Sequence, residues 1–100
     1  MDKLSREALT GLAERLPGWT FSEDQSTLHR RFEFDDFARA FAFMTQMAKV
    51  SEELNHHPDW RNVDRRVEVT LTTHDVGGLT LLDLKWAQAA DEIWASIEMD

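Results

Sequence analysis

The stretch LNHHPDW, residues 54–60, separates a helical pattern from a strand pattern and marks where the chain changes direction. Apolar residues recur at helical spacing before it, and apolar and polar residues alternate after it. Pro58 disfavours helical geometry for its predecessor, so we expect the helix to end near Asn55 or His56. The connection that results carries two adjacent histidines and a tryptophan, in a position where functional side chains often concentrate.

The helix before this connection is expected to begin at a cap formed by Asp35 or Asp36. Its apolar residues recur at positions that share one face, which is typical of a helix that covers a sheet. The expected apolar stripe consists of Phe37, Phe41, Met44, Ala48 and Ser51, widened by Phe43, Met47, Val50 and Leu54.

Toward the N-terminus, the pattern predicts one more helix followed by a hairpin. Ser5 is a candidate cap for a helix that Pro17 and Gly18 end. Residues 19–23 and 27–34 alternate as two strands joined by a tight turn. The chain therefore supplies a helix and two strands before its longest helix begins.

Beyond LNHHPDW, the sequence predicts a strand and a last helix. Residues 63–72 alternate valine and leucine with charged and polar residues, which is typical of a strand with one buried face. The HDVGG segment ends this strand, and a helical pattern runs from about Leu81 toward Ile97. Three strands are visible, and the order favours one α+β domain over residues 1–100, with helices on one face of an antiparallel sheet.

Composition excludes several classes of function. A net charge of −8 with scattered basic residues disfavours nucleic acid and anionic membranes as direct partners. The chain has no cysteine, which suits a reducing compartment and excludes thiolate chemistry. Its apolar runs are far shorter than a membrane span, and its N-terminus has no apolar signal region. We therefore expect a cytoplasmic protein.

Three of the four histidines fall at the ends of predicted elements and are candidates for catalysis. His56 and His57 follow the long helix, and His74 follows the strand at 63–72. Because histidine exchanges protons near neutral pH, three of them around one cavity could supply both an acid and a base. His29 lies in the middle of a strand among charged neighbours and is expected to be a surface residue.

The histidine pair has two other interpretations. Glu53 and His56 have the i, i+3 spacing of carboxylate-bridged metal sites, but that design needs a second copy, which the sequence lacks, so we expect no metal. Alternatively, HHPDW is simply a helix C-terminus whose histidines complement the helix dipole. The residues alone do not decide between this structural role and a catalytic one.

A resemblance favours the catalytic role. The chain has, in order, Glu52, then His56-His57-Pro58 and Trp60, then His74 after VEVTLTT, and a closing Asp83. This pattern resembles the pterin-4a-carbinolamine dehydratase family in order and spacing, over about a third of the chain. The sequence departs from the family where Asp64 and Arg65 replace the usual aromatic residue and asparagine.

The resemblance implies a four-stranded antiparallel sheet with three helices on one face, in the order α-β-β-α-β-β-α. The strand not visible in the pattern should then lie within residues 60–66. It also implies a homodimer or homotetramer. We expect self-association for a second reason, because helices cover only one face of the predicted sheet.

The resemblance also implies a reaction, the dehydration of 4a-hydroxytetrahydropterin to quinonoid dihydropterin in tetrahydrobiopterin recycling, without metal or other cofactor. The implied catalytic residues are His56, His57 and His74. The substrate would come from an aromatic amino acid hydroxylase. Two alternatives are a binding module or coactivator on the same fold, which the departure at Asp64 favours, and an enzyme acting on another pterin.

Four further residues of the pattern are candidates for substrate binding, and each has a structural alternative. Asp83 is expected to close a capping box with Thr80, a role that is compatible with one in the site. Trp60 is expected either to wall the pterin pocket or to lie across the sheet edge. Pro58 should shape the loop, and Glu52 is either part of the site or a solvated surface residue.

Overall fold

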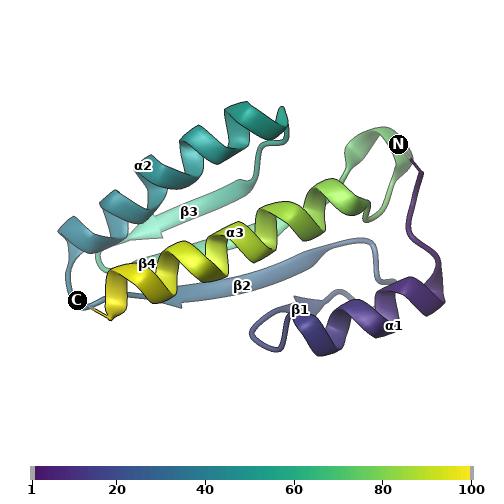
Figure 1. The fold of residues 1–100 in the computed structure, drawn as a ribbon, viewed down its shortest axis with the longest axis horizontal. Coiled ribbons are helices and arrows are strands. Elements are labelled where there is room, and N and C mark those ends of the chain that lie inside the picture. Colours follow the sequence, from purple (N-terminus) through teal and green to yellow (C-terminus); the bar gives the residue numbers. More distant parts are fainter. Residues whose placement is uncertain (1, 100) are drawn as a thin grey trace.

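The computed structural model describes residues 2–99, which form three α-helices and one four-stranded antiparallel sheet. This confirms the α+β class and the order α-β-β-α-β-β-α. The elements are α1 (Arg6–Arg15), β1 (Thr20–Phe21), β2 (Leu28–Glu33), α2 (Phe37–Leu54), β3 (Asp59–Val63), β4 (Arg66–Leu71), the short 3₁₀ helix η1 (His74–Val76) and α3 (Leu81–Glu98). In Figure 1, α2 and α3 lie side by side across the sheet.

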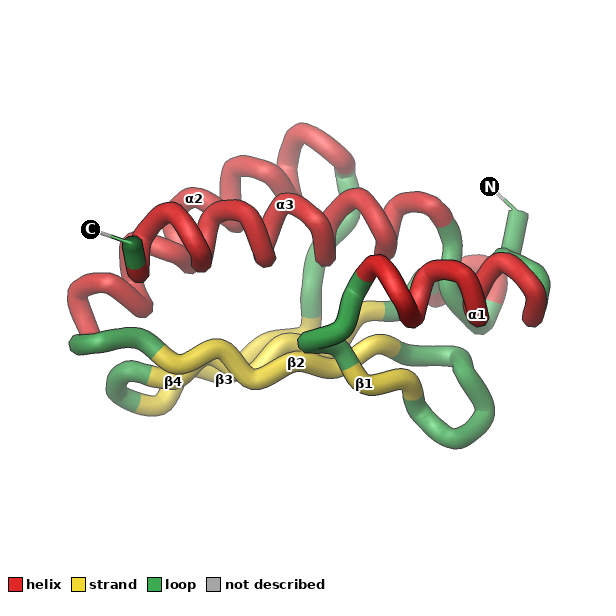
Figure 2. The backbone as a smooth tube through the Cα atoms, turned by 60° about the horizontal axis from the view of Figure 1, so that its bottom comes forward, coloured by secondary structure: helices red, strands yellow, loops and turns green. Residues whose placement is uncertain are grey.

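The sheet has the strand order β1-β2-β4-β3, and all three helices lie on one of its faces (Figure 2). Directly opposed residues share a face, so the pairs Leu28 with Leu71 and Phe32 with Val67 point together toward the helices. Charged and polar residues of the same strands point to the other face. The open face is therefore polar. Its exposure to solvent is thus no longer a reason to expect self-association.

The strand predicted at residues 63–72 is β4, which is shorter than expected and covers Arg66–Leu71, because Val63 belongs to a separate strand. β3 ends at Val63, and the chain turns at Asp64, whose φ is 54°. The Asn62 side-chain amide donates to the carbonyl oxygens of Asp64 (2.9 Å) and Arg66 (2.8 Å), which holds the turn closed. The additional strand that the family resemblance implied is β3, at Asp59–Val63.

The apolar stripe expected on α2 is confirmed in part: Phe43, Met47 and Ser51 are buried, but other members of the stripe face solvent. Phe37 and Phe41 are 50% and 56% exposed. Apolar side chains surround most of this helix, so periodicity alone did not identify the face that packs against the sheet and α3. The residues of α2 that are buried are Ala40, Phe43, Met47 and Ser51.

A polar cluster joins α3 to β2 and to the segment that precedes β1. The Asp91 carboxylate accepts a hydrogen bond from Trp19 Nε1 and forms an ion pair with Arg30, both at 2.8 Å. The Arg30 guanidinium lies 4.5 Å from the ring centroid of Phe32 and 4.9 Å from that of Trp94. This cluster contains none of the three candidate histidines and has a structural role. No helix within residues 2–99 is long and apolar enough to cross a bilayer.

Candidate active site

The end of α2 places the histidine pair. Asn55 adopts the left-handed conformation, with φ 49° and ψ 46°, and the His56 amide donates to the Ser51 carbonyl at 2.9 Å. This is a common way to end a helix, because it satisfies carbonyl groups of the last turn. The reversal leaves His56 buried, while the His57 side chain stays 56% exposed.

All three candidate histidines line one open cavity of about 270 Å³. His56 and His57 come from the α2–β3 connection, and His74 comes from the first residue of η1. The cavity thus brings His74 together with His57 and His56, which lie 17 and 18 positions earlier in the sequence. The remaining lining residues are Asn55, Thr72, Thr73, Asp75 and Leu82.

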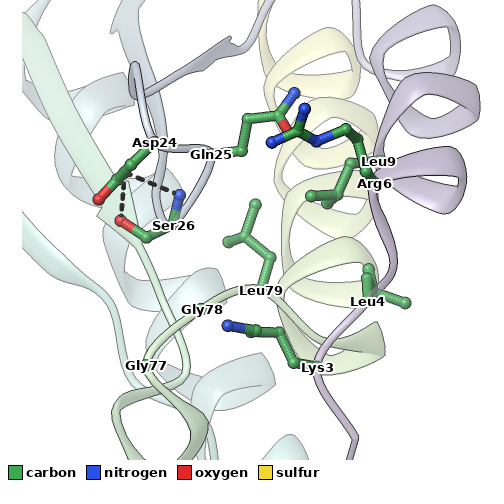
Figure 3. A pocket seen from close by; sticks show the side chains of 10 residues that line it. All are labelled: Lys3, Leu4, Arg6, Leu9, Asp24, Gln25, Ser26, Gly77, Gly78 and Leu79. Carbon is green, nitrogen blue, oxygen red and sulfur yellow. Dashed lines mark hydrogen bonds between the residues drawn. The ribbon is translucent and has the colours of Figure 1, made fainter.

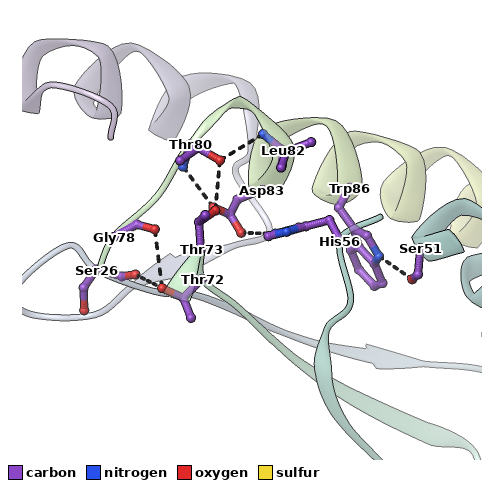
Figure 4. Close-up of polar contacts among 10 residues, drawn as sticks. All are labelled: Ser26, Ser51, His56, Thr72, Thr73, Gly78, Thr80, Leu82, Asp83 and Trp86. Atoms are coloured by element: carbon purple, nitrogen blue, oxygen red, sulfur yellow. Dashed lines mark hydrogen bonds and ion pairs between the residues drawn. The ribbon is translucent and has the colours of Figure 1, made fainter. Parts of the chain in front are cut away.

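His56 is held from behind by Asp83. The His56 Nε2 atom lies 2.6 Å from Asp83 Oδ1, and Asp83 is fully buried (Figure 4). The other carboxylate oxygen accepts a hydrogen bond from the Thr80 backbone amide at 2.9 Å and from the Thr73 hydroxyl at 2.7 Å. Asp83 does not line the cavity, so it contacts His56 but not the space in front of it.

Asp83 also confirms its predicted structural role. Thr80 caps α3, and a capping box joins Thr80 to Asp83, which is the third residue of the helix. The two roles are compatible because a carboxylate has two oxygens, and here Oδ2 serves the cap while Oδ1 serves the histidine.

His57 has a carboxylate partner of its own. Its Nε2 atom is hydrogen-bonded to Oε2 of Glu52, which lies one turn earlier on α2 and is 77% exposed. Glu52 is therefore a surface residue, as one alternative held, and it also orients a candidate catalytic histidine. Within residues 2–99, the ring of His74 has no hydrogen-bond partner, so only two of the three histidines are paired with carboxylates.

Trp60 and Pro58 lie outside the cavity lining. Trp60 points inward from the edge strand β3 and packs edge-to-face against Trp86, with ring centroids 6.1 Å apart. Pro58 is half-buried directly before β3. Trp86 in turn donates from Nε1 to the Ser51 hydroxyl at 2.9 Å, so the tryptophan pair supports the turn that carries His56.

Sequence reasoning missed the polar residues that surround the histidines. Thr72, Thr73 and Asp75 line the cavity together with Asn55, and none was singled out as a site residue. The available signal was position, because the three flank His74 directly in the chain. Their spacing matches no general motif, so only the fold reveals them.

A second hollow of about 200 Å³ lies between the N-terminal segment, the β1–β2 turn and Gly78 (Figure 3). Lys3 and Arg6 line it, but both are exposed. The Asp24 carboxylate in this hollow accepts hydrogen bonds from Ser26 and Ser22 within the β1–β2 turn, and these bonds lower the pKa of Asp24. This hollow holds no histidine and does not compete with the histidine cavity as a site for proton transfer.

Within residues 2–99, no group of three or more histidine, cysteine, aspartate or glutamate side chains is arranged to hold a metal ion. The carboxylates near the cavity face single histidines instead: Asp83 contacts His56 from behind, and Glu52 contacts His57 from the side. Such pairs orient an imidazole and stabilise its protonated form. The arrangement is suited to acid–base chemistry.

Comparison with known proteins agrees with this geometry. The family model for pterin 4 alpha carbinolamine dehydratase matches residues 2–93. A protein of Bradyrhizobium sp., provisionally named pterin-4-alpha-carbinolamine dehydratase, is 48% identical over 97% of this chain and 98% of its own. A protein of Sinorhizobium fredii with the same provisional name is 48% identical over 91% of this chain and 87% of its own.

Two solved structures have a similar fold. A transcriptional coactivator/pterin dehydratase from Brucella melitensis superposes with a TM-score of 0.88 at 39% identity, over 92% of this chain and 98% of that one. A pterin dehydratase-like protein, identified as a RuBisCO assembly factor in the alpha-carboxysome, gives a TM-score of 0.67 at 26% identity, over 77% and 89%. On the extent of these matches, the chain belongs to the pterin-4-alpha-carbinolamine dehydratase family.

Proposed function

We propose that this protein dehydrates 4a-hydroxytetrahydropterin to quinonoid dihydropterin. The observation that carries the proposal is that His56, His57 and His74 line one cavity. The membership of the family supports the same substrate class. The reaction belongs to tetrahydrobiopterin recycling, and the substrate would be supplied by an aromatic amino acid hydroxylase in the cytoplasm.

The chemistry requires one proton to leave and another to arrive. N5 of the pterin loses a proton, the C4a–O bond breaks, a C4a=N5 double bond forms, and the departing hydroxyl takes up a proton to leave as water. A positioned acid or base typically accelerates such a step about 10²- to 10⁴-fold. Histidine side chains perform both transfers near neutral pH, so the reaction calls on no group from outside the chain.

The surroundings of the histidines support a division of roles. His57 is the proton acceptor for N5, and the hydrogen bond between its Nε2 and Glu52 orients the ring for that role. His56 and His74 approach the hydroxyl as acids. His57 is exposed and His56 is buried, and this difference in environment supports giving the two histidines different roles.

The test is stopped-flow absorbance of the quinonoid product after 4a-hydroxytetrahydropterin is generated in place. The wild-type protein should accelerate its appearance over buffer, and His57→Ala should lose about 10²-fold or more of that acceleration. His29→Ala is the matched control, because this exposed histidine lies on the open face of the sheet. A wild-type rate equal to that of buffer would refute the proposal.

A second candidate function is a protein-binding module on the same fold, and one observation favours it. Phe37 and Phe41 are exposed on α2 with their ring centroids 5.9 Å apart, and exposed aromatic clusters often mark contact surfaces. We propose a second copy of the chain as the first occupant, in a homodimer or homotetramer. An enzyme with such an interface is compatible with both candidate functions.

Sedimentation velocity distinguishes these states. A Phe41→Glu variant should dissociate a wild-type oligomer, because a carboxylate would then be buried without a partner. Gln46→Glu introduces the same side chain at another exposed position of α2 and should leave the oligomer intact. A wild-type protein that is monomeric at micromolar concentration would count against self-association through this surface.

A further inference from the structure

The hydroxyl of Thr73 does not cap the helix that follows it. Thr73 occupies the cap position of η1, yet its side chain makes no capping hydrogen bond to that helix. The hydroxyl instead lies 2.7 Å from Asp83 Oδ2 and 2.9 Å from the Thr80 hydroxyl, and Thr73 is only 8% exposed. A buried threonine that does not cap its own helix is here committed to the carboxylate behind His56.

The hydrogen bonds of this cluster run in one direction. Thr73 has a single hydroxyl proton, which it donates to Asp83, so the Thr80 hydroxyl must donate to Thr73. The Thr80 oxygen in turn accepts from the Leu82 amide at 3.2 Å. The three hydrogen bonds, from the Leu82 amide to Thr80, from Thr80 to Thr73 and from Thr73 to Asp83, therefore all run toward Asp83. None of them can be reversed without losing another.

This direction determines what Asp83 can do for His56. Oδ2 receives two donors, the Thr73 hydroxyl and the Thr80 backbone amide, and is therefore an acceptor that carries no proton. Because an ionised carboxylate has only acceptor sites, Oδ1 also acts as an acceptor. His56 must then donate from Nε2, which leaves Nδ1 for the substrate: Nδ1 accepts a proton when the ring is neutral and delivers one to the departing hydroxyl when the ring is protonated.

We propose that Thr73 is a positioning residue that holds His56 in the Nε2–H tautomer by orienting and charging Asp83. The inference rests on the proposed function for its catalytic consequence, but its structural content does not depend on the reaction. Thr73 acts through Asp83 and is not itself a proton donor to the pterin. Thr80 contributes as well, but its loss would also remove the cap of α3.

The experiment combines two readouts on the full-length chain. Ring ¹⁵N chemical shifts of ¹⁵N-histidine-labelled protein report which nitrogen of neutral His56 carries the proton, with the signal assigned from a His56→Ala variant. Stopped-flow kinetics report kcat and KM separately. The variants are Thr73→Val, which removes the hydroxyl at nearly constant shape, and Thr73→Ser, which keeps it.

In Thr73→Val we expect the His56 signals to move away from the Nε2–H pattern and kcat to fall about tenfold or more, with KM little changed. Thr73→Ser should restore both. Thr70→Val is the matched control, because it removes a hydroxyl from β4 that bonds His29 on the open face. It should leave the His56 signals and kcat as in the wild type.

An unchanged His56 spectrum in Thr73→Val would overturn the inference, whatever happens to kcat. A spectrum that Thr73→Ser fails to restore would also overturn it, because the hydroxyl would not be the cause. If the wild-type protein proves inactive, the proposed dehydration fails, and the ring spectra alone then decide the role of Thr73. The two failures are therefore distinguishable.

Discussion

The two adjacent histidines differ in the environment of the carboxylate that each contacts. Asp83 is buried behind His56 and makes three hydrogen bonds, whereas Glu52 is exposed beside His57. Removing one partner of a buried hydrogen-bonded pair leaves the other unsatisfied, which costs more than losing a solvated contact. The protein should therefore tolerate substitution of Glu52 better than substitution of Asp83.

Replacing Glu52 should have a modest effect. Glu52→Gln keeps the shape of the side chain but removes its charge beside the His57 ring, so we expect kcat to fall less than about tenfold, in line with an exposed pair worth about 1 kcal/mol or less. Glu53→Gln is the matched control, because Glu53 is exposed on the same turn and has no contact with a histidine. Equal kcat values in the two variants would show that Glu52 has no role.

Asp91 should make stability depend on pH. Burial raises the pKa of Asp91, and this outweighs the opposing hydrogen bond from Trp19 and the charge of Arg30. The folded state thus binds its proton more tightly than the unfolded chain, so the stabilisation is present below the ordinary pKa of 3.8 and is lost as pH rises through the higher folded value. Urea denaturation at several pH values should show the wild type losing stability relative to Asp91→Asn across this interval.

The opposite sign is expected at Asp24. Hydrogen bonds from Ser26 and Ser22 lower the pKa of Asp24, so its contribution is present above pH 3.8 and is lost as pH falls. Relative to Asp24→Asn, the wild type should therefore gain stability as pH rises. For Asp91, a stability difference between the wild type and Asp91→Asn that does not change with pH would contradict the role given to burial.

Among the elements, the last turn of α2 matters most for the site, because it sets the direction of both histidines. Asn55 holds a positive φ there, which only glycine and, to a lesser extent, asparagine adopt readily. The turn is further held by the His56 amide on the Ser51 carbonyl and by the Trp86 ring on the Ser51 hydroxyl. The helix end is thus a built part of the cavity rather than a frayed terminus.

Substitution of Asn55 tests this turn. Asn55→Ala should lower the free energy of unfolding by about 1 kcal/mol, because a Cβ disfavours the left-handed conformation. Asn55→Gly should be near neutral or stabilising, since glycine adopts that conformation without strain. Thermal or urea denaturation measures both. The prediction fails if alanine is tolerated as well as glycine.

At the scale of the whole molecule, one face of α2 packs against the sheet and α3, and the opposite face is left exposed. Phe43 is fully buried and packs against Phe32 and Phe34 of the sheet side, with ring centroids 4.8 and 5.2 Å away. Phe41, two positions earlier, is 56% exposed. The two phenylalanines therefore have different roles, although the sequence places both in the same apolar segment.

Matched truncations measure this difference. Phe43→Ala should lower the free energy of unfolding by about 3–5 kcal/mol, because it leaves a cavity at the centre of the core. Phe41→Ala should change the stability of the isolated chain by roughly 0.5 kcal/mol or less, as is usual for surface positions. Urea denaturation at low protein concentration gives both values. Equal losses would mean that α2 is rotated from the position described.

Much of this architecture follows from local rules. Ser5, Asp36 and Thr80 cap the three helices where short polar side chains precede apolar periodicity, and Asp36 was one of two expected caps. The end of α2 at Leu54 agrees with the expectation drawn from Pro58. The family pattern drew attention to the three histidines, and the cavity now brings them together.

Other features were beyond local rules. The turn at Asp64 interrupts an alternation that continues on both sides, so the pattern hides the boundary between β3 and β4. The hydrogen bonds from Thr80 to Thr73 and from Thr73 to Asp83 join the end of β4 to the start of α3, and no spacing rule describes them. Their geometry exists only after η1 and α3 have packed against the end of α2.

The sequence by itself determined the kinds and order of most elements, because capping, periodicity and helix stops act between residues a few positions apart. Only the tertiary structure decided which face of α2 is buried, where the β3–β4 hairpin turns and how Asp83 meets His56. These depend on contacts between segments distant in the chain. Packing and buried hydrogen bonds select among faces and partners that local preference leaves equal.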